Sequence, residues 1–242
     1  MMEEQAYADL HHLEQDHWWY RGTRFIYRTL LRRYVSGACR PALDLGCGTG
    51  GNLALLCPWG PVTGLEPWRP ALTLCPRDAA SLVQGTAETL PFQDASFGLV
   101  AALGVIEHVA DDVGMLCEAR RICRSGGSIL LLTSAFMFLW SRHDEANRHV
   151  RRYTARELRE KAERAGLRVR YISYLNFFLF PVAALIRTLQ RLRPPQGDPH
   201  LDMFPVPEPF GTGLTGLLAL EGWLMQWISL PLGVSMVAVL ER

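Results

Sequence analysis

One short segment combines an acid with closely spaced glycines: Ala42-Leu43-Asp44-Leu45-Gly46-Cys47-Gly48-Thr49-Gly50-Gly51-Asn52. A short apolar run ends near Asp44, and the glycines then open a helical segment. Such a loop exposes the main chain to a ligand, since a side chain at Gly46 or Gly48 would stand between the backbone and that ligand. The free N–H groups of the following helix would also point toward it. The segment therefore predicts a strand, a ligand-binding loop and a helix.

Two ligand classes fit this loop. Gly46, Gly48 and Gly51 satisfy the G-x-G-x-x-G pattern of dinucleotide-binding proteins. The stretch from Asp44 to Gly50 equally satisfies D-x-G-x-G-x-G, a second pattern of nucleotide-binding loops. The loop by itself leaves both classes open.

A second acid lies where the next strand would end. Val62-Thr63-Gly64-Leu65-Glu66 reads as a strand, and Glu66 lies about 20 residues beyond Gly46, where the next parallel strand delivers a carboxylate to a ribose. That carboxylate can accept hydrogen bonds from both ribose hydroxyls. We therefore expect Glu66 to bind a nucleoside.

The elements that position these acids follow from the hydrophobic pattern. Further apolar runs occur at 81–85, 96–103 and 128–133, with a helical stretch at 111–123. The run at 96–103 is continuous, as in a strand buried on both faces. Alternating strands and helices from 42 to 133 are typical of a doubly wound sheet. Farther on, Thr154 and Glu157 form a capping box before a helix that Gly166 ends.

The composition indicates one globular domain. Of the 242 residues, 49% are hydrophobic and 20% are charged, which suffices for a real core. The formal net charge of +1 gives no indication of a nucleic-acid partner. The six cysteines show no C-x-x-C spacing and follow no secretory signal, which disfavours disulfides and zinc sites. We expect a cytoplasmic protein.

Several motifs occur in a fixed order and together resemble one family. They are Asp44 to Gly50, Glu66, Glu88-Thr89-Leu90-Pro91-Phe92, Val105-Ile106-Glu107-His108 and Arg124-Ser125-Gly126-Gly127. In this order they resemble the class I S-adenosylmethionine-dependent methyltransferases, in particular the group with ubiquinone-type and other small-molecule enzymes. The resemblance covers roughly residues 40–133.

The resemblance implies a complete sheet and a domain plan. We expect a Rossmann-like, doubly wound α/β fold with seven mostly parallel strands. The sixth strand is expected at 167–175, and an antiparallel last strand at 235–240. The single domain, 1–242, would comprise a helical cap at 1–36, a nucleotide-binding core at 37–175, an apolar helical insertion at 176–233 and the last strand at 234–242.

The resemblance also implies how S-adenosylmethionine would be held, with S-adenosylhomocysteine as product. The glycines would cradle the methionine end, Asp44 its amino group and Glu66 the ribose, while Leu103 and Gly104 would lie beside the sulfonium. Thr86, Ala87 and Glu88 would lie by the adenine. The predicted cofactor residues are Tyr20, Arg24, Asp44, Gly46, Cys47, Gly48, Asn52, Glu66, Pro67, Thr86, Ala87, Glu88, Leu103, Gly104 and His108.

Methyl transfer mainly requires that the protein hold a nucleophile in line with the methyl group and exclude water. By position, His108 is the candidate general base, because an imidazole accepts a proton near pH 7. The alternative is that His108 only packs near the cofactor. His143 is the second catalytic candidate. Its segment, 135–153, reads either as an acceptor-binding lid or as a solvated polar stretch.

No metal is expected in that segment. His143, Asp144, Glu145 and His149 could be drawn as a metal site, but their spacing matches no strong template. Methyl transfer also needs no metal.

Two further segments have more than one interpretation. The cluster from His17 to Arg24 either anchors a helix to the sheet or folds over the ligand, with Tyr20, Arg21 or Arg24 meeting a carboxylate.

The insertion is apolar, but Pro231 and Gly233 argue against a membrane span. Four roles of the insertion remain open: core packing, a homodimer contact, an apolar lid over the acceptor, or contact with a membrane surface. Our hypothesis is that both segments build the acceptor pocket, and that a short hairpin replacing 176–233 would spare cofactor binding but abolish turnover.

The sequence thus predicts methyl transfer to an oxygen or nitrogen of a small-molecule acceptor, apolar or lipid- or sugar-linked, by in-line displacement. One alternative is an NAD-dependent oxidoreductase that uses the same glycines. Another is a non-catalytic cofactor-binding subunit, because the family often has an acid at Thr86 and Asp at Gly98 and Gly104.

Overall fold

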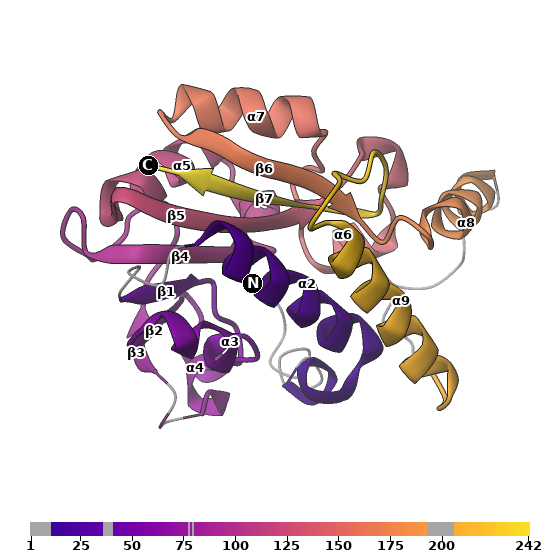
Figure 1. Ribbon diagram of the computed structural model, residues 1–242, viewed down its shortest axis with the longest axis horizontal. Coiled ribbons are helices and arrows are strands. Elements are labelled where there is room, and N and C mark those ends of the chain that lie inside the picture. Colours follow the sequence, from indigo (N-terminus) through magenta and orange to yellow (C-terminus); the bar gives the residue numbers. More distant parts are fainter. Residues whose placement is uncertain (1–10, 36–40, 77, 79, 193–205) are drawn as a thin grey trace.

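The computed structural model describes residues 11–35, 41–76, 78, 80–192 and 206–242. Within them the chain forms one seven-stranded sheet (Figure 1). The strands are β1 (Ala42–Leu45), β2 (Val62–Glu66), β3 (Ser81–Gln84), β4 (Phe97–Leu103), β5 (Cys123–Ser134), β6 (Arg168–Leu175) and β7 (Ser235–Glu241). These bounds match the expected strands except at β5, which begins earlier because Phe97 already pairs with Cys123 before the register shifts.

The strand order is β3-β2-β1-β4-β5-β7-β6. The first five strands pair in parallel, and β7 inserts between β5 and β6, antiparallel to both. The carboxyl ends of β1, β2 and β4 therefore meet at one edge, where an open parallel sheet binds its ligands. The expected Rossmann-like, mostly parallel fold with an antiparallel last strand is confirmed.

Helices cover both faces of the sheet. They are α2 (Trp18–Tyr34), α3 (Leu53–Leu56), α4 (Arg69–Leu74), α5 (Asp112–Ile122), α6 (Arg142–Ala146), α7 (Ala155–Arg164), α8 (Phe180–Leu192) and α9 (Phe210–Leu224), with short 3₁₀ turns η1 (Cys57–Trp59), η2 (Ile106–His108) and η3 (Met137–Leu139). Residues 11–16 are also helical. The capping box predicted for α7 is present, with Thr154 and Glu157 exchanging hydrogen bonds, and Gly166 follows at φ +75°.

Two cores result from the period-2 alternation along the strands. Leu43 and Leu45 of β1 belong to a core that also contains buried residues of α5 and α7. Ala42, on the other face, belongs to a core with buried residues of α2, α3 and α9. Because alternate residues share a face, Asp44 lies on the side covered by α2 and α3. Glu66 lies on that side as well, two positions beyond Gly64 and four beyond the core residue Val62.

Helix α9 of the insertion is part of the second core. It lies side by side with α2 (Figure 1), and glycines allow this approach, since a Cβ at Gly22 would lie 2.5 Å from Leu218 Cδ1. Glu221 of α9 is fully buried, and its carboxylate accepts the Asn176 and Phe178 N–H groups at 2.7 and 3.1 Å. Replacing 176–233 would therefore remove core residues and uncover α2. This packing argues against our expectation that such a change would spare cofactor binding.

None of the helices in the described ranges is long and apolar enough to cross a membrane. Helix α8 differs from the others in having no buried residue.

Candidate functional site

The glycine loop is held by β2 and by backbone conformations that favour glycine. The Gly46 and Cys47 N–H groups donate to the Leu65 carbonyl at 2.8 and 3.0 Å. Gly46 and Gly48 have φ angles of +73° and +54°. A Cβ at Gly46 would lie 2.5 Å from Val105 Cγ2, so packing within the protein already requires glycine there, and the expected obstruction of a ligand at Gly46 stays a prediction.

Gly48 has open space beside it, and its contact with a ligand stays a prediction. A Cβ there would meet only Glu14 Oε1, at 4.0 Å, and one at Gly104 would meet only Glu107 Oε1, also at 4.0 Å. Gly104, at φ +79°, follows directly after Leu103 at the end of β4. Two glycines at the carboxyl edge of the sheet thus leave space beside carboxylates.

The two strand-end acids lie beside this loop. Glu66 is buried and accepts the Gly48 N–H at 3.1 Å and the Trp68 N–H at 3.2 Å. Asp44 is only 2% exposed. Burial, followed by the charges of Glu14 and Glu66, raises the pKa of Asp44 to about 8. The free protein therefore holds a proton on Asp44 at neutral pH.

The sequence did not identify a third acid, Glu14, which comes from the helical residues 11–16. Its carboxylate is buried against the loop and accepts a hydrogen bond from the Thr49 hydroxyl. Burial raises the pKa of Glu14. No local pattern distinguishes Glu14 from the other acids of the N-terminal segment, because only its contact with Thr49, 35 positions away, brings it here.

Arg24 and Tyr20, both predicted to bind cofactor, lie beside Glu14. The Arg24 guanidinium donates to the Glu14 backbone carbonyl. Burial lowers the pKa of Arg24, opposed by the Glu14 and Tyr20 charges, and burial raises the pKa of Tyr20. Trp18 and Trp19 pack against the second core, as the anchoring interpretation expects, and a ligand role for Tyr20 and Arg24 stays a prediction.

These residues fit a ligand that is mainly cationic and carries one carboxylate. Asp44 Oδ2 and Arg24 Nε are buried polar atoms without a hydrogen-bond partner, and such atoms are costly unless a ligand satisfies them. S-adenosylmethionine matches this set, since it brings an ammonium, a sulfonium and a carboxylate. Asp44 would hold the ammonium, Arg24 the carboxylate and Glu66 the ribose.

The other predicted cofactor residues lie in the segments that follow β1, β2 and β3. Cys47 packs its thiol toward β2, where a Cβ at Gly64 would lie 2.8 Å from Cys47 Sγ, and Asn52 precedes α3. Pro67 follows β2 and is exposed, and its carbonyl accepts Gln84 Nε2 at 3.1 Å. After β3, Thr86 and Glu88 are exposed and Ala87 is buried in the first core. Their contacts with a cofactor stay predictions.

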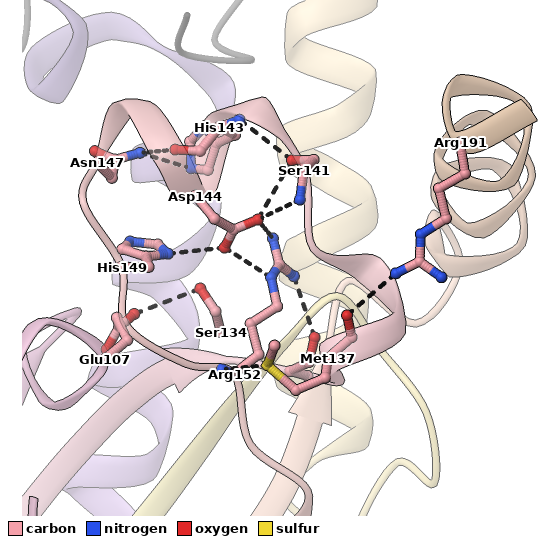
Figure 2. Close-up of polar contacts among 11 residues, drawn as sticks. Glu107, Ser134, Met137, Ser141, His143, Asp144, Asn147, His149, Arg152 and Arg191 are labelled. Atoms are coloured by element: carbon pink, nitrogen blue, oxygen red, sulfur yellow. Dashed lines mark hydrogen bonds and ion pairs between the residues drawn. The ribbon is translucent and has the colours of Figure 1, made fainter. Parts of the chain in front are cut away.

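Beyond β4, two polar side chains, His149 and Asp144, extend from the predicted base His108. The His108 and His149 rings meet edge to face with centroids 4.7 Å apart, and His149 Nδ1 lies 2.8 Å from Asp144 Oδ1 (Figure 2). Burial, and then the His149 charge, lowers the pKa of His108 to about 4. His108 is therefore a neutral imidazole at pH 7.

His143, the second catalytic candidate, lies beside His149. Its ring centroid lies 6.1 Å from that of His149, and its Nε2 lies 3.1 Å from Asn147 Nδ2 (Figure 2). The structure thus brings His149 next to the predicted base, and a catalytic role for His143 stays a prediction. Sequence reasoning had considered His149 only as a metal ligand.

The segment from Ala135 to Tyr153 is ordered by a buried ion pair. Asp144 is fully buried and receives Arg152 Nε at 2.7 Å and Arg152 Nη2 at 2.9 Å. Burial alone would raise the pKa of Asp144, but hydrogen bonds from His149 and Arg152 outweigh it and hold that pKa below its ordinary value. The interpretation of this stretch as merely solvated is wrong. Among the described residues, no group of three or more metal-ligating side chains gathers.

Comparison with known proteins identifies the central part of the chain. A family model described as "Methyltransferase domain" matches residues 43–131. A protein of Mycolicibacterium smegmatis, described as a probable S-adenosylmethionine-dependent methyltransferase, is 31% identical over 164 residues, which cover 65% of this chain and 62% of that protein. The matches span smaller shares, 29% and 44%, of two other curated relatives.

Two solved structures share the whole fold. One chain of the complex between the Haloferax volcanii Trm112 methyltransferase activator and a methyltransferase superposes with a TM-score of 0.63 at 19% identity, covering 98% of this chain and 94% of that chain. An S-adenosylmethionine-dependent methyltransferase from Thermotoga maritima gives a TM-score of 0.55 at 20% identity, covering 93% of each chain.

Proposed function

This chain belongs to the class I S-adenosylmethionine-dependent methyltransferases, and from that premise we propose that it transfers a methyl group to an oxygen or nitrogen of a small acceptor. The observation that carries the proposal is the cluster of buried acids, Glu14, Asp44 and Glu66, around a loop whose Gly48 leaves space for a ligand. S-adenosylmethionine is the cofactor of this family, and the cluster suits its charges.

The same acids argue against the dinucleotide alternative. The charges of Glu14 and Glu66 help to raise the pKa of Asp44, and the charge of Glu66 helps to raise that of Glu14, so the site disfavours additional negative charge. A dinucleotide would bring a pyrophosphate dianion into it, and like charges repel strongly where water is excluded. A ligand with an ammonium and a sulfonium would instead relieve this repulsion.

For the chemistry, we propose His108 as the group that accepts the acceptor's proton. S-adenosylmethionine, when bound, supplies an electrophilic methyl group, so the protein has to orient the acceptor and remove its proton. His108 is neutral at pH 7 and so has a nitrogen lone pair for that proton, while its lowered pKa makes it a weaker base than an ordinary imidazole. His149 and Asp144 lie behind His108 and would orient its ring. His143, whose ring centroid lies 6.1 Å from that of His149, is the second candidate.

The proposed acceptor class rests on exposed apolar side chains. They occur on the loop after β5 and on the insertion, among them Met137, Phe138 and Trp223. Such surfaces suit an apolar, or lipid- or sugar-linked, acceptor better than a small ion. They would equally suit a membrane surface or a second copy of the chain.

The first experiment is calorimetric titration of the purified chain with S-adenosylmethionine, S-adenosylhomocysteine and NAD in parallel. We expect the first two to bind and NAD not to bind; binding of NAD alone would overturn the proposal. Transfer of tritium from methyl-labelled cofactor into apolar alcohols, amines and a lipid extract then tests turnover. Cofactor binding with no transfer to any acceptor, in wild type and in a His108→Ala variant alike, would instead favour a non-catalytic subunit.

A further inference from the structure

The outer side of α2 carries a row of arginines. Arg21, Phe25, Arg28 and Arg32 follow one another at spacings of four, three and four residues, so they share one side of the helix, and all four are exposed. The whole helix contains five arginines and no acidic residue. Arg21 lies 4.0 Å from Glu208, which precedes α9. The side of α2 that faces solvent is therefore basic.

The outer side of α9 is apolar and uncharged. Leu220, Trp223 and Trp227 follow at three- and four-residue spacing, Trp227 in the turn just after the helix, and they are 46%, 53% and 72% exposed. In the stretch 209–232 the one charged residue is Glu221, which is fully buried. This part of the insertion thus presents large apolar side chains to solvent and no charge.

The two outer sides form one surface. Helices α2 and α9 lie side by side (Figure 1), and a Cβ at Gly222 would lie 3.0 Å from Phe25 Cδ1. Gln226 Nε2 donates to the Trp223 carbonyl at 3.4 Å. A surface depression of about 550 Å³ joins this end of the insertion to α2, and it is lined by Phe25, Arg28, Thr29, Arg32, Arg33 and Gln226. The arginines of α2 and the tryptophans that flank Gln226 therefore border one another.

We propose that this outer surface of α2 and α9 binds an anionic membrane surface. Arginines are attracted by the surface potential of anionic lipids, and tryptophans favour the headgroup region of a bilayer. Apolar side chains bordered by arginines are typical of segments that lie in the membrane interface without crossing it. The proposal goes beyond the proposed function and does not depend on it, because it concerns where the chain docks and not which reaction it catalyses.

A second copy of the chain suits this surface less well. In a two-fold contact the same patch meets itself, so the arginines of α2 would face either arginines or the uncharged side of α9. The acid at its border, Glu208, already lies beside Arg21. An anionic bilayer supplies the opposite charge and an apolar layer together, which is the combination that this surface presents.

Flotation of the purified full chain with lipid vesicles tests the proposal. The vesicles are phosphatidylcholine alone or phosphatidylcholine with phosphatidylglycerol, each at low and at high salt. We expect the chain to float with the vesicles that contain phosphatidylglycerol. High salt should weaken this binding, because it screens the attraction between exposed arginines and anionic lipid.

One pair of variants tests the charges. Arg28→Gln with Arg32→Gln should weaken binding to the anionic vesicles by about tenfold or more, the loss expected for two arginines near the membrane surface. The matched control, Arg156→Gln with Arg159→Gln, removes two exposed arginines of α7, which packs on the opposite core from α2. It should leave binding within about twofold.

A second pair tests the apolar side chains. Trp223→Gln with Trp227→Gln should also weaken binding by about tenfold or more, because two large side chains no longer gain by leaving water. The matched control is Leu185→Gln with Leu189→Gln on α8, whose side chains are 61% and 55% exposed. It removes exposed apolar area outside the proposed surface and should leave binding within about twofold.

Three results would overturn the proposal: no flotation with anionic vesicles, equal flotation without phosphatidylglycerol, or equal loss in a variant pair and its control. A wild-type dimer in light scattering that the tryptophan variant converts to a monomer, with no vesicle binding, would assign the surface to a second copy instead. Titration of each variant with S-adenosylmethionine checks that it is folded. Absence of cofactor binding in wild type would refute the proposed function and leave the vesicle result standing.

Discussion

Cofactor affinity should rise with pH, because Asp44 must lose a proton to hold an ammonium group. Burial, with the Glu14 and Glu66 charges, raises the pKa of Asp44 to about 8, so below that pH the free protein is mostly protonated at this carboxyl. If the cofactor binds the carboxylate form, each molecule bound releases up to one proton. Binding should therefore tighten as pH rises toward 8 and level off above it.

The size of the effect follows from the pKa. For binding to the ionised form alone, the apparent dissociation constant scales as one plus the ratio of proton activity to the acid constant. Between about pH 6 and about pH 7.5 this factor falls about 20-fold, which corresponds to about 1.8 kcal/mol. We limit the comparison to below about pH 7.5 because the α-amino group of the free cofactor itself loses its proton near about pH 8.

The assay is calorimetry in two buffers of different ionisation enthalpy, which counts the protons released. Asp44→Asn should weaken binding and abolish its pH dependence, whereas Glu14→Gln should only move the midpoint to lower pH, because it removes one of the charges that raise the Asp44 pKa. Affinity that does not change with pH in wild type, or a pH dependence retained in the asparagine variant, would refute the reasoning.

The raised pKa of Asp44 also lowers the stability of the folded protein in the absence of cofactor. Its folded pKa of about 8 lies above the ordinary value of 3.8, so the folded form holds a proton that the unfolded chain has released. The stability of the free protein should therefore decline as pH rises from about 4 to about 8 through this group. Asp44→Asn should then melt at a higher temperature than wild type near pH 7.5 without cofactor, and near wild type at pH 4; equal melting at pH 7.5 would contradict the raised pKa.

Four further outcomes are expected. Glu66→Ala should weaken cofactor binding by on the order of 1.5–3 kcal/mol in calorimetry through lost charge-assisted contacts; no loss would refute the ribose role. Gly46→Ala should lower the melting temperature more than Gly48→Ala, since both strain a positive φ but only the first meets a side chain at 2.5 Å; equal shifts would contradict this. Asp144→Asn should cost about 3–5 kcal/mol in urea unfolding by leaving a buried arginine unpaired, and a cost below about 1 kcal/mol would contradict it. Glu221→Ala should cost about 2–5 kcal/mol by orphaning two N–H donors, and Glu221→Gln clearly less; equal costs would mean that packing alone holds α9.

Local pattern was sufficient for the sheet and for the acids at its edge. Glycines at positive φ and the apolar run before Asp44 predict β1 and its loop, because both constraints act within a few residues. Parallel strands end at one edge of a sheet, so the run that ends at Glu66 predicted a carboxylate at the edge where the glycine loop lies. The family resemblance then supplied the ligand.

Tertiary structure decided which other side chains join that edge. Glu14 reaches Thr49 across 35 positions of sequence, and His149 reaches His108 only because the segment after β5 folds back over η2, where the Val150 N–H donates to the Glu107 carbonyl at 2.8 Å. Polar residues such as Asp144 look solvated in sequence, since burial depends on what packs over them and an ion pair can offset its cost. Sequence thus determined the strands and the acids that end them. Only the packing of distant segments determined how those acids are charged, that His149 adjoins His108 and that α9 belongs to the core.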